Sequence, residues 1–146
     1  MEGNEMEDLK QRILEVIGQP NMTGFATVTE EGAPWVRYVM AFASDDMIIR
    51  FSTFLGSRKV SQVRNDPRVH LVCGVTDPED WDSYIQIEGT AEVVTDIRDK
   101  EDFWNPALSE YFDGPEDPDY AIIKVTPSRI EYYGKENMEM EVWTSE

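Results

Sequence analysis

Residues 51–69 read FSTFLGSRKVSQVRNDPRV, and this stretch predicts the order strand, turn, short helix, strand. Its opening run of hydrophobic and β-branched residues is typical of a strand, and Ser57 is a favourable N-cap for a helix. Val60 and Val63 lie three residues apart, as they would on one face of that helix, and Pro67 ends it. The alternating residues after this proline predict the next strand.

Strand patterns also dominate on both sides of this stretch. Residues 4–18 predict an amphipathic helix, and a second helix over residues 95–112 must be kinked or split by Pro106. Gly89 predicts a bulge or a bend inside its strand. The predicted strands cover residues 22–29, 35–42, 47–53, 68–75, 83–94, 120–125 and 129–133, and the tail after them alternates over residues 138–143.

Six or seven mostly sequential strands with few helices favour a mainly β protein. We expect an antiparallel, Greek-key-like β-barrel with flanking α-helices, and a simple meander for its first three strands. A length of 146 residues suits one domain, 1–146, with the barrel in residues 22–133 and a C-terminal tail in residues 134–146.

The net charge excludes several classes of partner. Thirty acidic and thirteen basic side chains give −17, and a field of that sign repels nucleic acid and anionic lipid. The charge is unevenly spread, because residues 47–75 hold five basic side chains and one acidic one, a net charge of +4. The rest of the chain therefore carries −21, and this local excess of basic residues calls for an explanation.

Few residues are available for metal, disulfide or membrane chemistry. Cys73 is the single cysteine, and its apolar neighbours predict a buried, unreactive thiol. His70 is the single histidine, so we expect no metal site. The acidic residues 113–119 lack the ligand spacing of a calcium loop and predict a solvated loop. With no secretory signal and no long apolar run visible, we expect a cytoplasmic protein.

The start of the predicted short helix breaks an electrostatic rule. Arg58 and Lys59 occupy its first turn, where the helix dipole disfavours cations by about 0.3–1 kcal/mol each. Together with the Ser57 hydroxyl and the free backbone N–H groups they suit an anion such as a phosphate, unless both side chains bend back to distant carboxylates. Arg37, among apolar neighbours on a strand, serves either a strand-edge salt bridge or the same anion.

These motifs resemble a known family. Ser57-Arg58-Lys59 opening a helix, followed by Asn65-Asp66-Pro67-Arg68-Val69, is similar to the flavin-binding signature of the FMN-binding split-barrel superfamily typified by pyridoxamine 5′-phosphate oxidase. Residues 37–40 and 87–92 resemble two strands of that family. Phe103-Trp104 and residues 118–123 resemble its general-stress-protein branch. The likeness runs from about residue 9 to residue 133.

The resemblance implies a role for each matching position in a flavin site. The FMN phosphate would be held by Arg37, Ser57, Arg58 and Lys59. The isoalloxazine ring would be lined by Tyr38, Val39 and Met40, largely through backbone groups, and the ribityl chain and ring would meet Ser52 and Thr53. The family places its flavin at the interface of a homodimer. Trp104 would then approach the flavin from the partner subunit, or else pack in the core of its own subunit.

The chain also departs from the oxidases of this family. Where those enzymes carry a Lys for the substrate phosphate, this chain has Phe42, and Tyr84 replaces an expected Gln. The resemblance therefore favours FMN binding over pyridoxal phosphate synthesis. We expect a flavin-dependent oxidoreductase acting on a small molecule, with no residue that stands out as a general acid or base. The alternatives are a non-catalytic flavin-binding stress or sensor protein, or the same fold binding deazaflavin F420 or haem, for which His70 is the available axial ligand.

Overall fold

The computed structural model describes residues 3–136 and 139–145 and contains three helices, one 3₁₀ helix and seven strands in that part of the chain. The helical elements are α1 (Gly3–Ile17), α2 (Arg58–Asn65), α3 (Ile97–Phe103) and the 3₁₀ helix η1 (Pro106–Glu110). The strands are β1 (Asn21–Val28), β2 (Pro34–Ala43), β3 (Ile49–Phe54), β4 (Arg68–Cys73), β5 (Ser83–Val94), β6 (Tyr120–Gly134) and β7 (Met140–Thr144).

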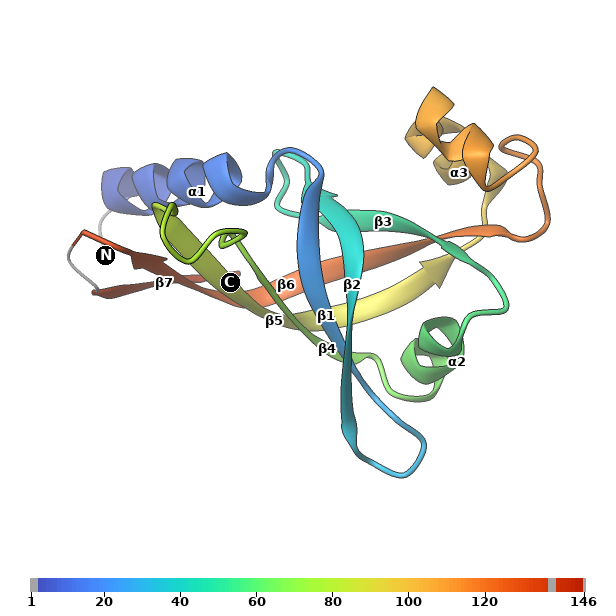
Figure 1. Cartoon of the computed structure of the whole chain (residues 1–146), viewed down its shortest axis with the longest axis horizontal. Coiled ribbons are helices and arrows are strands. Elements are labelled where there is room, and N and C mark those ends of the chain that lie inside the picture. Colours follow the sequence, from blue (N-terminus) through green and yellow to red (C-terminus); the bar gives the residue numbers. More distant parts are fainter. Residues whose placement is uncertain (1–2, 137–138, 146) are drawn as a thin grey trace.

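All strand pairs are antiparallel, and six strands close into a barrel. The strand order is β3-β2-β1-β4-β5-β6-β7, and an additional pairing of β3 with β6 closes the ring (Figure 1). The first three strands are neighbours, as predicted, while β4 returns to pair with β1. The predicted mainly β barrel is thus confirmed, and β7 is added to the edge of β6 outside the closed ring.

One long strand corrects the prediction of two final strands. Residues 120–125 and 129–133 belong to the continuous strand β6, and Pro127 lies inside it opposite Gly89. A register shift between Glu88 and Gly89 accommodates the proline, which confirms the predicted bulge. A Cβ atom at Gly89 would lie 2.5 Å from the Thr126 carbonyl oxygen, so a glycine is needed where the two strands approach.

The structure also shows what the predicted C-terminal tail and the second predicted helix form. Met140–Thr144 pair with β6 as β7, so the predicted tail contributes a strand, while Met138 lies outside the described residues. The expected helix over residues 95–112 is split into α3 and η1, with Pro106 at the first position of η1. No helix in the described part of the chain is long and apolar enough to cross a membrane.

The barrel is split between two of its strands. β2 pairs with β1 along eight residues, but with β3 only at Phe42↔Arg50 and Ala43↔Ile49. Before Phe42, the side of β2 that faces β3 therefore has no strand partner among the described residues. Figure 1 shows β3 diverging from β2 and leading into α2, which packs against β1 and β5. Backbone groups along this side of β2 are left for another hydrogen-bonding partner.

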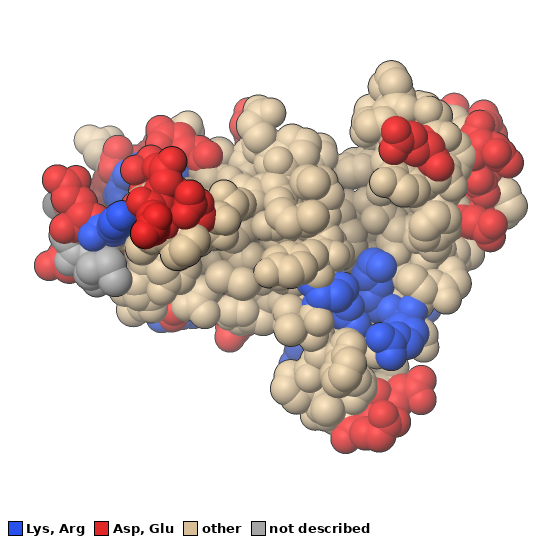
Figure 2. Space-filling model, in the orientation of Figure 1, with Lys and Arg blue, Asp and Glu red and all other residues tan. Residues whose placement is uncertain are grey.

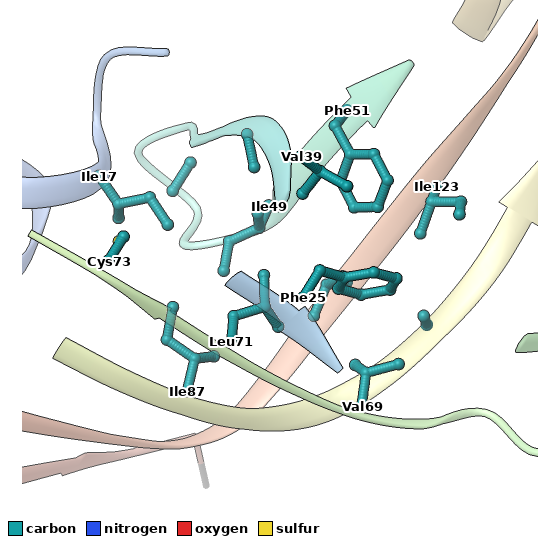
Figure 3. Close-up of a cluster of buried hydrophobic side chains, with 14 of the residues drawn as sticks. Ile17, Phe25, Val39, Ile49, Phe51, Val69, Leu71, Cys73, Ile87 and Ile123 are labelled. Carbon is teal, nitrogen blue, oxygen red and sulfur yellow. The ribbon is translucent and has the colours of Figure 1, made fainter. Parts of the chain in front are cut away.

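The barrel interior is filled by inward-facing residues of all six strands. Phe25 and Phe51 meet edge to face with ring centroids 4.9 Å apart, and Ile17 brings the end of α1 against the same cluster (Figure 3). Cys73 is buried in this core, and burial raises the pKa of its thiol to about 11, as expected for an unreactive cysteine. A separate small cluster lies beneath η1 and contains Leu108, Phe112, Tyr120 and Ile122.

Candidate functional site

Arg37 on β2 is held by neutral side chains rather than by an acid. Its Nη1 donates to Thr27 Oγ1 at 2.7 Å, and its Nη2 donates to Gln62 Oε1 at 2.7 Å. The Thr27 hydroxyl donates to the same Gln62 oxygen, so the three side chains form one network. No carboxylate lies within 4 Å of this guanidinium among the described residues, so the expected alternative of a strand-edge salt bridge is wrong.

The N-terminus of α2 presents donors without an internal acceptor. Ser57 stands at the N-cap position but does not cap the helix, because its hydroxyl lies 3.0 Å from Thr53 Oγ1 instead. The first turn of α2 contains no acidic residue. The N–H groups of this turn therefore have no side-chain acceptor, which is the arrangement that binds anions at helix N-termini.

Three basic side chains lie close together at the N-terminus of α2. Arg37 and Arg58 are close enough to repel each other, and so are Arg37 and Lys59. Burial lowers the pKa of Arg37, and Arg58 lowers it further; burial likewise lowers the pKa of Lys59, and Arg37 adds to this. None of the three makes an ion pair with any described residue, so their side chains do not bend back to distant carboxylates.

Arg37, Arg58 and Lys59 are called the cationic cluster from here on. Figure 2 shows Lys and Arg side chains gathered beside α2, while Asp and Glu cover both ends of the molecule and the tip of the β1–β2 hairpin. The Arg58 guanidinium lies over the ring of Trp35 at 5.9 Å from its centroid, which steadies the side chain by a cation–π contact. A small anion placed here would meet three positive charges and a helix N-terminus.

The residues predicted to line a ring lie along the open side of β2 and the facing strand. Val39 is buried, while Tyr38 and Met40 project outward from the barrel. On β3, Thr53 is buried beside Ser57, and Ser52 is half-buried on the opposite face. The structure thus places all nine predicted positions on the two strands that flank the split and at the start of α2.

Trp104 is the predicted site residue that lies elsewhere in the chain. It ends α3 and packs edge to face against Tyr120, with ring centroids 5.6 Å apart, in the small cluster beneath η1. This is the core position that the sequence left open as an alternative. Its approach to a flavin of the partner subunit stays a prediction.

Sequence reasoning missed Thr27 and Gln62. Both are polar and buried, and both hold the Arg37 guanidinium. Gln62 lies between Ser61 and Val63 on the buried side of a short helix, where a polar residue requires a partner. A polar residue at this buried helix position is the sequence signal that would have identified Gln62.

Other candidates that the sequence offered have ordinary roles in the fold. His70 is exposed on the outer face of β4, opposite Glu88 of β5. In the acidic loop of residues 113–119, the Asp117 carboxylate accepts the backbone N–H groups of Asp113 and Asp119, which lower its pKa. The described residues contain no group of three or more His, Cys, Asp or Glu side chains that could hold a metal ion.

Comparison with known proteins places this split barrel in a class. The pyridoxamine 5′-phosphate oxidase family profile matches residues 9–134, and the chain belongs to that family. Within it, the chain is 31% identical over 124 residues to general stress protein 26 of Bacillus subtilis (strain 168), covering 85% of this chain and 87% of that protein.

Many solved structures share the fold, and two of them illustrate it. The crystal structure of general stress protein 26 from Bacillus anthracis str. Sterne is similar at a TM-score of 0.78 and 29% identity, over 94% of this chain and 98% of that one. A structure described as an F420 reductase is similar at a TM-score of 0.62 and 25% identity, over 80% of this chain and 94% of that one. The relatives thus include proteins named for a stress response and for a deazaflavin.

Proposed function

We propose that the protein binds FMN and uses it as a flavin-dependent oxidoreductase on a small molecule. The observation that carries this proposal is the cationic cluster, in which three positive charges converge at a helix N-terminus without an acidic partner. Such an arrangement is destabilising until an anion occupies it, and a phosphate matches both its charge and its hydrogen-bond donors. The Ser57 hydroxyl adds a further donor at the same place.

The open side of β2 supports a planar ring next to the phosphate. Backbone groups of Tyr38, Val39 and Met40 have no partner on β3, and a flavin ring carries the donors and acceptors that would pair with them. Ser52 and Thr53 on β3 lie across the split and suit the ribityl chain. When bound, FMN supplies hydride acceptance and reoxidation, and the residues of this chain hold and orient it.

We further propose that two copies of the chain form a homodimer over this site. One face of β1, β2 and β4 exposes a band of large apolar side chains, and Tyr38 within it is 77% exposed. The band consists of Met22, Val36, Tyr38, Met40 and Val72. Exposed apolar patches of this kind mark interaction surfaces, and this one adjoins the proposed ring site.

Val72→Lys tests the dimer, since Val72 belongs to the band but not to the proposed flavin contacts. The variant is expected to sediment as a monomer at concentrations where the unchanged protein is a dimer. Ile97→Lys, which makes the same kind of change at a similarly exposed apolar residue of α3 outside the band, is the matched control and should leave the dimer intact. A protein that is monomeric before any substitution contradicts the dimer.

The similarity to an F420 reductase favours one second candidate, the deazaflavin F420 in the same split. F420 also carries a phosphate and a planar ring, so the cationic cluster would serve both cofactors. Haem would need an axial ligand, and His70 lies on the outer face of β4, away from the cationic cluster. A non-catalytic flavin-binding stress or sensor protein would use the same contacts without turnover.

The visible spectrum of the purified protein tests these candidates. FMN gives bands at about 375 and 450 nm, F420 a band at about 420 nm, and haem a Soret band. A colourless preparation should gain stability on adding FMN, by about 2.7 kcal/mol at a hundred times the Kd. A protein that is colourless and whose melting temperature does not change with FMN overturns the proposal. Anaerobic reduction by NADH or NADPH, followed by a survey of acceptors, separates an oxidoreductase from a passive binder.

A further inference from the structure

Lys100 is a buried cation that does not belong to the cationic cluster. It lies in the last turn of α3 and is 6% exposed. It forms no ion pair with any described residue. Lysine is almost never buried without a partner, because removing an ammonium group from water is costly. The contacts of its Nζ therefore indicate why a lysine is buried here.

Two groups receive the Lys100 ammonium group. Nζ donates to the backbone carbonyl of Asp117 at 3.1 Å and lies over the Tyr120 ring, 5.2 Å from its centroid. The Tyr120 hydroxyl in turn donates to the Lys100 carbonyl oxygen at 2.9 Å. These contacts attach α3 to the acidic loop of residues 113–119 and to the first residue of β6.

Asp117 is the residue on which the hydrogen bonds of the acidic loop converge. Its carboxylate accepts the backbone N–H groups of Asp113 and Asp119, each at 2.9 Å. Its carbonyl oxygen accepts the Tyr120 N–H at 3.1 Å in addition to Lys100 Nζ. The Tyr120 N–H and the Asp119 carbonyl belong to one planar peptide group. Asp117 therefore sets the direction in which the Asp119 carbonyl points.

The Asp119 carbonyl holds the turn that presents Ser57. Residues 54–57, called the Ser57 turn from here on, lead from the end of β3 into α2. The Leu55 N–H donates to the Asp119 carbonyl at 2.8 Å, and the Ser57 N–H donates to the Phe54 carbonyl at 3.0 Å. Figure 1 shows the segments that lead out of β3 and into β6 at the same end of the barrel.

The Ser57 turn also packs through its apolar side chains. Leu55 packs against the barrel core, and the ring of Phe54 contacts that of Phe112 with centroids 4.8 Å apart. The position of this turn decides where the Ser57 hydroxyl and the first N–H groups of α2 lie. Hydrogen bonds weaken steeply when their geometry changes, so a shift of about 0.5 Å in the turn weakens the binding of a phosphate.

We propose that Lys100 is a positioning residue for the phosphate site at the N-terminus of α2. It holds Asp117, Asp117 orients the Asp119 carbonyl, and that carbonyl holds the Ser57 turn. The Lys100 Nζ faces Asp117 and the Tyr120 ring, so it acts through these groups and not on the phosphate itself. This inference rests on the proposed function, in which the phosphate of FMN occupies this place.

The affinities for FMN and riboflavin test the inference, because the two molecules differ only in the phosphate. Lys100→Met keeps most of the side-chain stem and removes the donor. It is expected to weaken FMN binding about fivefold or more and to leave riboflavin binding unchanged. Lys100→Arg keeps a donor and is expected to recover FMN affinity. A folded Lys100→Met variant with an unchanged ratio of the two affinities overturns the proposal, since a merely structural lysine affects stability alone.

Asp117→Ala is the second variant, and it decides the outcome if Lys100→Met does not fold. It removes the acceptor of the Asp119 N–H and should produce the same selective loss of FMN affinity. Asp113→Ala is its matched control, because Asp113 contributes its backbone N–H and not its carboxylate to the network. Arg12→Met, which removes a hydrogen-bonded cation at the other end of the molecule, is the control for Lys100→Met. Equal losses in a variant and its control overturn the proposal.

Inorganic phosphate, compared with chloride at equal ionic strength, separates this inference from the proposed function. A protein that is stabilised by phosphate but binds no flavin loses the proposed function. The phosphate effect should then disappear in Lys100→Met, and its persistence overturns the positioning role. A protein that binds FMN and keeps its preference over riboflavin in Lys100→Met retains the proposed function and loses the positioning role. A protein that responds to neither FMN nor phosphate overturns both.

Discussion

Two arginines, Arg12 on α1 and Arg37 on β2, differ in whether an acidic side chain pairs with their positive charge. Arg12 donates to both carboxylate oxygens of Glu141 on β7, at 2.7 and 2.9 Å, and to Asp8 at 3.0 Å. It also lies over the Tyr132 ring. These hydrogen bonds to Glu141 and Asp8 raise the pKa of Arg12, whereas burial and a neighbouring cation lower the pKa of Arg37.

The difference separates a structural contact from a binding site. At Arg12 every charge has its counter-charge inside the fold, so the interaction joins the first helix to the last strand. At the cationic cluster the counter-charge is missing, although the chain has seventeen more acidic than basic side chains. Two acidic side chains thus pair with Arg12, whereas no described acidic side chain pairs with the cationic cluster. We therefore expect an anion to bind at the cationic cluster.

The largest expected effect comes from reversing two charges of the cationic cluster. Arg58→Glu with Lys59→Glu should weaken FMN binding at least 100-fold, about 2.7 kcal/mol, because the helix N-terminus then repels the phosphate. Fluorescence titration of FMN measures this. The matched control is Arg64→Glu with Arg98→Glu, which changes the net charge equally at exposed positions. An equal loss in the control would assign the effect to overall charge instead.

Removing the ion pair between Arg12 and Glu141 should lower the stability of the fold without changing FMN binding. Glu141→Gln is expected to lower the free energy of unfolding by about 1 kcal/mol at pH 7, since the pair is partly buried and partly screened by solvent. FMN affinity should not change. Urea unfolding measures the first quantity, with Glu101→Gln on exposed α3 as the control.

The same contact predicts a pH dependence. The hydrogen bond from Arg12 lowers the pKa of Glu141 below its usual value of 4.5 in the folded protein. Its stabilising contribution is therefore complete above the pKa of the unfolded carboxylate and is lost as the pH falls through the folded pKa. The stability difference between the unchanged protein and Glu141→Gln should shrink below about pH 4.5. A difference that stays constant into acid would contradict the ion pair.

Neutralising one member of the cationic cluster should have a smaller effect of opposite sign on stability. Lys59→Met keeps the side-chain stem and removes a charge whose pKa is lowered by burial and by Arg37. The protein without FMN should become more stable by about 0.5 kcal/mol at pH 7, while FMN binds more weakly. The gain should begin to shrink as the pH rises through the lowered pKa of Lys59 in the folded protein, and it should vanish above the pKa of this lysine in the unfolded chain. Lys10→Met on α1 is the control, and a loss of stability in Lys59→Met would contradict the comparison.

The smallest expected effect uses inorganic phosphate as a probe. About 20 mM phosphate should raise the melting temperature slightly more than chloride of equal ionic strength, by about 1 °C. The Arg58→Glu, Lys59→Glu variant should lose this difference, whereas Glu141→Gln should keep it. Equal responses to phosphate and chloride would show that the cationic cluster is only screened, not occupied.

Much of the fold was predictable because it depends on short spacings. Alternation along β4, with Val69, Leu71 and Cys73 inward, and the bulge at Gly89 both follow from neighbouring residues. The division of the final strand was predicted wrongly, because Pro127 looks like a break when its partner strand is not known. Register with Gly89, 38 residues away in the chain, decides that the strand continues.

The candidate site divides in the same way. By itself the sequence determined that Ser57, Arg58 and Lys59 begin a short helix and that cations gather in one fifth of an acidic chain. Only the tertiary structure decided that Arg37 joins them, held by Thr27 and Gln62, and that no described carboxylate pairs with any of the three cations. The physical reason is that helix starts depend on residues three or four apart. Which charges meet depends instead on how the barrel closes and where it stays open.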